Sequence, residues 1–191
     1  MQIPTHEASP DSSKPQLVID FWFKEIDSSY WFKKSADFDA EIERHFSATH
    51  RKACAGELAS LRTTASGRLA EILVLDQFSR NLFRDTAEAF AMDVVALVIA
   101  QEGIALKQDV ELPVEQRAFF YMPFMHSESR LIHIEAVELF SQPGLEKNLA
   151  FEIRHKEIID RFGRYPHRNA LLGRESSNAE LEFLKQPGSS F

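Results

Sequence analysis

Apolar residues recur along most of the chain at the three- and four-residue spacing of an amphipathic helix. No stretch alternates between apolar and polar residues as a half-buried strand would. The clearest stripe is formed by Phe38, Ile42 and Phe46, which stand four residues apart. The pattern therefore predicts an all-α fold of about seven or eight helices, over about 15–25, 36–53, 67–83, 85–103, 113–123, 127–141, 145–162 and 178–185.

Capping and breaking residues predict where several of these helices begin and end. Asp85 and Ser177 each precede a glutamate by three residues, which is the capping-box pattern of a helix start. Pro123 is expected to end or kink its helix. Gly163 can adopt the left-handed cap and Pro166 prevents the helix from resuming, so a turn of fixed shape should follow residue 162.

Composition indicates one domain with an aromatic interior. The 191 residues are 44% hydrophobic and include sixteen phenylalanines, and a chain of this length buries roughly 70% of its unfolded surface. We therefore expect a single domain over 14–191. Residues 1–13 are polar and are predicted to be a flexible leader.

Charge and cysteine content narrow the function classes. A net charge of −7 argues against generic binding to nucleic acid or to anionic membranes, which requires a basic surface. The single cysteine, Cys54, excludes an internal disulfide. No secretion signal is recognised and the apolar runs are short, so we expect a cytoplasmic protein.

Recognised cofactor motifs are missing from the sequence. There is neither a Walker pattern nor a Gly-x-Gly-x-x-Gly loop, so no nucleotide cofactor is predicted. His126, Glu128, His155 and His167 are conceivable metal ligands, but they lack a fixed ligand spacing, and we predict no metal. Cys54 follows His50 by one helical turn, which we interpret as an incidental contact.

A polar stripe interrupts the apolar helix predicted over about 67–83. Its first half is apolar on nearly every side, whereas its second half places four polar side chains within one arc of about 100°: Asp76, Gln77, Arg80 and Arg84. Asp76 and Arg80, four residues apart, are expected to pair. The stripe can line a ligand pocket or belong to an internal ion-pair network. Ionisable groups have perturbed pKa values in both settings, so the pattern alone does not separate the two.

Basic and polar residues concentrate in the turn that follows Gly163. They are Arg164, His167, Arg168, Asn169 and Arg174. The planar guanidinium group binds carboxylate or phosphate through two parallel hydrogen bonds, so these arginines, with those of the helix over about 67–83, can clamp an anion. The chain's own carboxylates can equally bind them, with Asp76, Glu128 and Glu175 as candidates.

The histidines divide into two groups. His133 and His155 lie among apolar residues at helical spacing and are interpreted as partly buried, hydrogen-bonded core residues. His126 and His167 lie next to the chain breaks, where either can act as a general acid or base with Glu128 orienting it.

Four blocks of sequence resemble the bacterial DUF924 family, whose function is unknown. They are Asp20–Phe23, Leu75–Arg84, Tyr121–Glu128 and Phe162–Asn169 together with Leu172–Arg174. The resemblance spans about 17–185 and implies a single all-helical domain of tetratricopeptide-like form, an irregular stack of antiparallel helical pairs. It implies no activity. Ser79 and Tyr165 stand where we expect proline and phenylalanine, and the charged members of the blocks are retained.

Two functions fit these observations. The first is a pocket that binds a small anionic ligand, and possible hydrolysis or transfer there would use His126, Glu128 and His167, with Asp76, Gln77, Arg80, Arg84, Arg164, Arg168, Asn169 and Arg174 binding the ligand. The second is a noncatalytic scaffold that grips a peptide or protein partner along a concave face, with the polar cluster serving only as an internal network.

Overall fold

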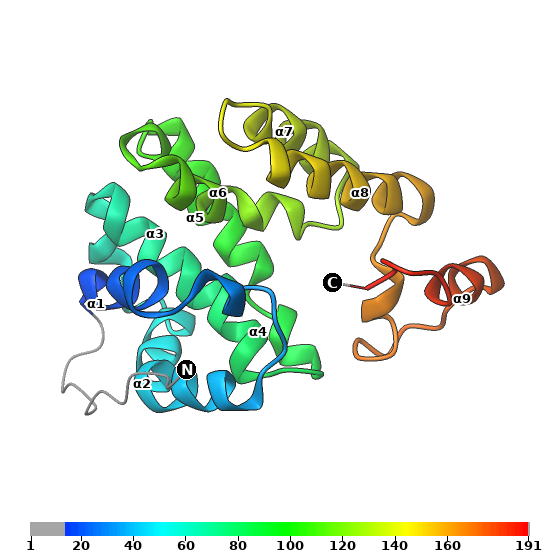
Figure 1. The fold of residues 1–191 in the computed structure, drawn as a ribbon, viewed down its shortest axis with the longest axis horizontal. Coiled ribbons are helices and arrows are strands. Elements are labelled where there is room, and N and C mark those ends of the chain that lie inside the picture. Colours follow the sequence, from blue (N-terminus) through cyan, green and yellow to red (C-terminus); the bar gives the residue numbers. More distant parts are fainter. Residues whose placement is uncertain (1–13, 191) are drawn as a thin grey trace. The chain divides into compact units, whose positions relative to one another are not determined.

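The computed structural model describes residues 14–190, and within that range the chain forms helices and turns without a β-strand (Figure 1). The predicted all-α fold is confirmed, while the predicted leader over 1–13 lies outside the described residues. The α-helices are α1 (Pro15–Asp20), α2 (Ala36–Cys54), α3 (Ala65–Leu73), α4 (Ser79–Leu82), α5 (Asp93–Ala105), α6 (Val114–Met125), α7 (Arg130–Phe140), α8 (Glu146–Phe162) and α9 (Asn178–Leu184). None of these helices is long and apolar enough to cross a bilayer.

Shorter helical segments extend or connect the α-helices. Two are wider π-helices, η1 (Phe21–Glu25) after α1 and η4 (Val74–Phe78) between α3 and α4. The others are 3₁₀-helices: η2 (Ser28–Tyr30), η3 (Ala59–Thr63), η5 (Ala87–Phe90), η6 (Asp109–Glu111) and η7 (Pro166–Arg168). The helices predicted over about 15–25 and 67–83 are therefore present, each with a π-helical segment that apolar spacing alone does not reveal.

The prediction that Asp85 starts a helix is wrong. Asp85 has a φ of 60°, whereas a helix N-cap has an extended backbone. The chain instead makes the 3₁₀-helix η5, and α5 begins at Asp93. Pro123 does not end its helix, because it lies inside α6, which continues to Met125.

Other predicted helix ends are confirmed. Gly163 ends α8 with a φ of 69°, and its N–H donates to the carbonyl of Ile159. Ser177 begins α9 with a complete capping box, in which Glu180 accepts from the Ser177 N–H and donates its own N–H to the Ser177 side chain. A left-handed backbone is less favourable for a residue with a Cβ than for glycine, which explains why a glycine stands at position 163.

The described residues form two compact units. Unit 1 comprises 14–84 and 88–123, and unit 2 comprises 85–87 and 124–190. The single domain expected over 14–191 stays a prediction.

The core of unit 1 is built from aromatic side chains, as composition predicts. The fully buried Trp22 is the centre, with its ring centroid 5.5 Å from that of Phe78 and 5.7 Å from that of Phe119. Phe46, from the predicted stripe on α2, packs against Phe78 in a tilted arrangement with centroids 4.8 Å apart. Such rings contribute large buried areas and preferred tilted geometries.

In unit 2, α7 and α8 lie side by side as consecutive helices (Figure 1). The buried side chains of Ile158, Ile159 and Tyr165 form a small core, against which Phe162 and Phe183 pack. This core places the turn after α8 next to α9. The arginine-rich turn therefore sits on a packed base.

Candidate functional site

Asp76 and Gln77 lie on the π-helix η4 in the interior of unit 1. The Asp76 side chain is fully buried, and its Oδ2 accepts a hydrogen bond of 2.6 Å from Nε2 of Gln77. The same Nε2 lies 3.3 Å from the sulfur of Met122. A buried carboxylate requires such donors, because desolvation of an unpaired charge is costly. Asp76 and Gln77 thus form part of one hydrogen-bonded group.

Arg80 binds two carboxylates. Its Nη1 lies 3.1 Å from Oδ1 of Asp76, which confirms the pair predicted from helical spacing. The same nitrogen donates to the Asp76 carbonyl at 2.6 Å and lies 3.0 Å from Oδ1 of Asp93 at the start of α5. The guanidinium carbon is 5.8 Å from the centroid of the Phe90 ring. Arg80 therefore connects α4, on which it lies, to the start of α5.

Arg84 and Asn81 converge on Asp39 of α2. Arg84 donates from Nε to Oδ2 and from Nη2 to Oδ1, both at 2.6 Å, and Asn81 donates to Oδ1 at 2.8 Å. These are the two parallel bonds that a guanidinium makes with a carboxylate. Asp39 was not among the predicted partners, since it lies 45 residues earlier in the sequence than Arg84.

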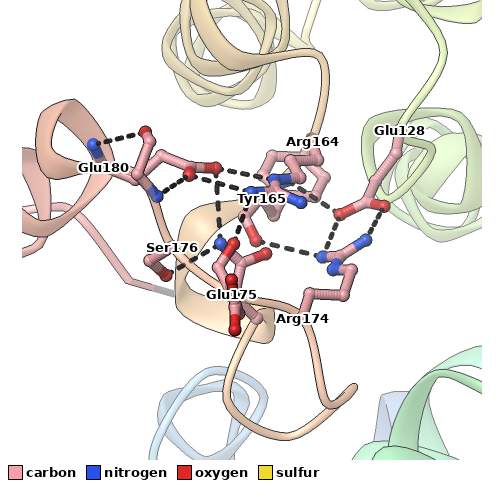
Figure 2. A network of polar contacts seen from close by, with 9 residues as sticks. Glu128, Arg164, Tyr165, Arg174, Glu175, Ser176 and Glu180 are labelled. Atoms are coloured by element: carbon pink, nitrogen blue, oxygen red, sulfur yellow. Dashed lines mark hydrogen bonds and ion pairs between the residues drawn. The ribbon is translucent and has the colours of Figure 1, made fainter.

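In unit 2, Arg174 occupies both oxygens of Glu128 (Figure 2). Nη1 donates to Oε2 at 2.6 Å and Nη2 donates to Oε1 at 2.9 Å. The N–H of Tyr165 also donates to Oε1, at 2.8 Å. Burial alone would raise the pKa of Glu128, but the bonds from Arg174 and from the Tyr165 N–H hold it below its usual value. Glu128 is therefore a charged acceptor that joins the α6–α7 connection to the turn.

Arg164 makes the matching contact with Glu180 of α9 (Figure 2). Nε donates to Oε1 at 2.7 Å and Nη2 donates to Oε2 at 2.9 Å, while Nη2 also donates to the carbonyl of Glu175 at 2.8 Å. Asn169 adds a bond of 3.3 Å to Oε1. The hydrogen bond from Arg164 lowers the pKa of Glu180 and raises the pKa of Arg164. The two ends of the turn are thus each held by an arginine–carboxylate pair.

The remaining basic residues of the turn, Arg168 and His167, pack near the ring of Tyr165. The guanidinium carbon of Arg168 lies 4.6 Å from the centroid of that ring, and the Arg168 side chain is buried. The His167 ring centroid is 5.7 Å from that of Tyr165. A cation over an aromatic face is stabilised by the ring quadrupole. His126, which directly follows α6, is half-buried.

Sequence reasoning missed a buried polar group that lies under this turn. Nδ1 of His133 is 2.6 Å from Oε1 of Glu152, and its Nε2 is 2.8 Å from the Ser127 carbonyl and 3.2 Å from the Tyr165 hydroxyl. The Tyr165 hydroxyl donates to the Met125 carbonyl at 2.5 Å. His133 is fully buried and not partly buried as predicted, and its interpretation as a hydrogen-bonded core residue holds.

His155 is also buried, and its Nδ1 lies 2.8 Å from the Phe151 carbonyl. Burial, reinforced by the nearby charge of His126, lowers the pKa of His155 to about 3. At neutral pH His155 is therefore an uncharged donor. The predicted contact of Cys54 with His50 is present at 3.5 Å, and burial raises the pKa of the Cys54 thiol.

The predicted site residues fall into both units. Asp76, Gln77, Arg80 and Arg84 belong to unit 1, and His126, Glu128, Arg164, His167, Arg168, Asn169 and Arg174 belong to unit 2. Four of the arginines, Arg80, Arg84, Arg164 and Arg174, each bind a carboxylate within their own unit. Of these carboxylates, Asp39 and Asp93 were not predicted, and Glu180 was predicted only as part of a helix cap. The assignment of these residues to catalysis or ligand binding stays a prediction. Residues 14–190 contain no group of three or more His, Cys, Asp or Glu side chains arranged to hold a metal ion.

Together, the fold and these networks define an all-helical protein in which Arg80, Arg84, Arg164 and Arg174 are each bound by a carboxylate of the chain itself. Residues 18–188 match the family described as "Bacterial protein of unknown function (DUF924)". The chain belongs to this family, as its sequence blocks predict.

A solved structure of a protein of unknown function from Agrobacterium tumefaciens is similar over most of its length. The two sequences are 36% identical, the TM-score is 0.87, and the match covers 92% of this chain and 98% of the other. No match is found among curated proteins. The comparisons therefore establish the family and leave the biochemical role to be inferred from the chain itself.

Proposed function

We propose that the chain is a noncatalytic binding protein that docks a helical segment of a partner protein, and that its arginine-rich clusters are internal structural networks. The observation that carries the proposal is the pairing of the arginines. Four arginines expected to hold an anion each bind a carboxylate of the chain: Arg80, Arg84, Arg164 and Arg174. An incoming anion would have to displace a built-in carboxylate that already satisfies the guanidinium group.

The outward face of α5 is the proposed docking surface. Val94, Val95 and Val98 are all exposed, and Val94 keeps 71% of its surface accessible. The opposite face of α5 is buried through Ala96, Ile99 and other small or apolar residues. A helix that is apolar on all sides is normally covered on all sides, and apolar surface patches are typical of binding sites. An amphipathic partner helix would cover the three valines through residues spaced three and four apart.

We also propose that the helices follow the tetratricopeptide-like stacking of antiparallel pairs. Support comes from α7 and α8 in unit 2, which are consecutive in sequence and pack against each other. Scaffolds of this kind bind partners without changing them chemically.

Selection of helical peptides on the purified protein tests the proposal. Peptides enriched by display should bind the wild type and should bind Val98→Asp at least about tenfold more weakly, because an acidic group would be buried in an apolar contact. Leu181→Asp on α9 makes the same kind of change at another exposed position and should leave binding unchanged. Circular dichroism should show both variants folded. Peptides that bind wild type and Val98→Asp equally would contradict the proposal.

The anion pocket is the second candidate, and one observation favours it. Arg164 and Arg174 come from the same turn and both remain partly exposed, so a small anion that replaced Glu180 or Glu128 would reach them from solvent. His126 or His167 would then act as general acid or base. Glu128 would have to exchange its bonds to Arg174 and Tyr165 for an orienting role.

Thermal unfolding separates the two candidates. A ligand specific to the folded state stabilises it by about 2.7 kcal/mol at 100 times its dissociation constant. The anion hypothesis therefore predicts a higher unfolding temperature with one class among phosphates, nucleotides and carboxylates, and loss of that shift in Arg164→Ala. The binding-protein proposal predicts no shift with the whole panel and a lower unfolding temperature for Arg164→Ala.

A further inference from the structure

We propose that the chain self-associates through unit 2, with the outer face of α7 in one copy packing on α8 of a second copy. The α7 face consists of Leu131, Ile134, Glu135 and Glu138. Their spacing of three, four and seven residues from Leu131 places them on one side of the helix. All four are exposed, and Leu131 keeps 72% of its surface accessible. This face therefore combines an apolar centre with negative charge.

The α8 face has the opposite charge. Lys147, Phe151 and Arg154 are exposed and are spaced by four and three residues, again on one side of the helix. Phe151 keeps 54% of its surface accessible, and the guanidinium carbon of Arg154 lies 5.8 Å from its ring centroid. The aromatic ring with its flanking cations complements an apolar, acidic surface in both apolar character and charge.

The charges on both faces are available for a partner. Within residues 14–190, Glu135, Glu138, Lys147 and Arg154 form no ion pair, whereas Lys156 and Asp160 on the same helix α8 pair with each other. α7 and α8 pack together through other side chains, including His133 and Glu152. The two charged faces consequently do not satisfy each other inside one chain.

A second copy of the chain satisfies both faces at once. Any other partner would have to supply both an apolar, basic surface and an apolar, acidic one, whereas a copy of unit 2 carries each. In a closed dimer, α7 of each copy contacts α8 of the other. The same α7–α8 contact is then made twice, as two-fold symmetry requires. The net charge of −7 opposes association in general, so the local complementarity sets which surfaces meet.

Charge reversal tests the pairing directly. In the first variant, Glu135→Lys is combined with Glu138→Lys, which makes both faces basic. In the second, Lys147→Glu is combined with Arg154→Glu, which makes both faces acidic. Each variant alone should associate at least about tenfold more weakly than wild type in sedimentation equilibrium, because like charges then face each other.

An equimolar mixture of the two variants is the decisive sample. It should restore association as a 1:1 complex, since each basic face then meets an acidic one. The control combines Glu43→Lys with Glu115→Lys, two exposed changes in unit 1 of the same net charge, and should associate as wild type does. Circular dichroism and thermal unfolding of each variant establish that it is folded.

Three outcomes would overturn the proposal. They are a monomeric wild type throughout the concentration series, single variants that associate as strongly as wild type, and a mixture that stays monomeric while wild type does not. The peptide-binding assay on α5 addresses a different surface, so its result and the result of the mixing experiment are independent.

Discussion

Nδ1 of His133 lies 2.6 Å from Oε1 of Glu152, and both side chains are fully buried between α7 and α8. The second carboxylate oxygen, Oε2 of Glu152, is buried and accepts no hydrogen bond from the described residues. Burial raises the pKa of Glu152, while the contact with His133 opposes that rise. His133 is therefore the main compensation for this buried carboxylate, with a smaller contribution from the charge of Lys156, which makes the contact a sensitive point of unit 2.

His133→Phe should strongly destabilise the protein at pH 7. The substitution keeps an aromatic ring but removes the donor from a buried carboxylate, and breaking such a pair costs about 3 kcal/mol or more. Glu152→Gln removes the charge instead and should cost only about 1 kcal/mol. Urea unfolding of the two single variants and the double variant gives the coupling energy, and additive effects would show that the pair has no special role.

The same variants predict a dependence on pH. In His133→Phe, Glu152 must take up a proton in the folded state more readily than in the unfolded state, because its folded pKa is raised. The folded state therefore gains relative stability as the pH falls toward the raised pKa of Glu152, and the defect of His133→Phe should shrink as the pH is lowered from 7. A defect of constant size would indicate lost packing in place of a stranded charge.

The stability of the wild type should fall in acid because of His155. Its pKa is lowered to about 3 in the folded state, whereas an unfolded histidine titrates near 6.5. Between these pH values His155 is protonated in the unfolded chain but not in the folded one. The contribution of His155 to the free energy of unfolding is therefore complete above about pH 6.5, and it is lost at about 1.4 kcal/mol per pH unit below that. Urea unfolding at a series of pH values measures the slope.

His155→Gln is the variant that checks this assignment. It should have a shallower slope of stability against pH than the wild type between pH 6.5 and pH 4. His45→Gln, which removes a half-buried histidine of unit 1, should not flatten the slope in the same way. Identical slopes for wild type and His155→Gln would mean that other groups cause the acid sensitivity.

The fold could be predicted where one physical cause determines the structure. The stripe of Phe38, Ile42 and Phe46 produces a buried helical face in any all-α arrangement, and all three are buried in α2. Gly163 likewise behaves as its lack of a Cβ predicts. The prediction for Asp85 was wrong because its local pattern also suits a turn. Its left-handed backbone depends on contacts with residues distant in the sequence, which a short stretch of sequence does not contain.

The candidate site shows the same limit. The pair of Asp76 with Arg80 was predictable, since helical geometry places residues four apart together. The pairs of Arg84 with Asp39 and of Arg164 with Glu180 join residues that are 45 and 16 positions apart. Their charges gave a list of possible partners, but only the packing of the helices selects one. The choice between an anion pocket and an internal network depends on that selection.

Arg84→Lys should test whether the paired geometry with Asp39 matters. A lysine keeps the charge but cannot make two parallel bonds to one carboxylate, so we expect a loss of about 1–2 kcal/mol, with a similar or larger loss for Arg84→Ala. Arg44→Ala removes a more exposed arginine that binds Glu41 one turn away and should cost less than about 0.5 kcal/mol. An Arg84→Lys variant as stable as the wild type would show that charge alone suffices.

Gly103→Ala should destabilise unit 1 even though alanine favours helices over glycine by about 1 kcal/mol. A Cβ at this position of α5 would collide with Cδ of Arg68 and would lie 2.5 Å from the ring of Phe120. Arg68 cannot easily move, because it is buried and donates to the side chain of Gln108. Overpacking of this kind costs about 1–3 kcal/mol, which urea unfolding would detect. Adding Phe120→Leu makes room beside the new methyl group, so the double variant should lose less stability than the sum of the two single changes. A Gly103→Ala variant more stable than the wild type would show instead that α5 is free to shift away from α3.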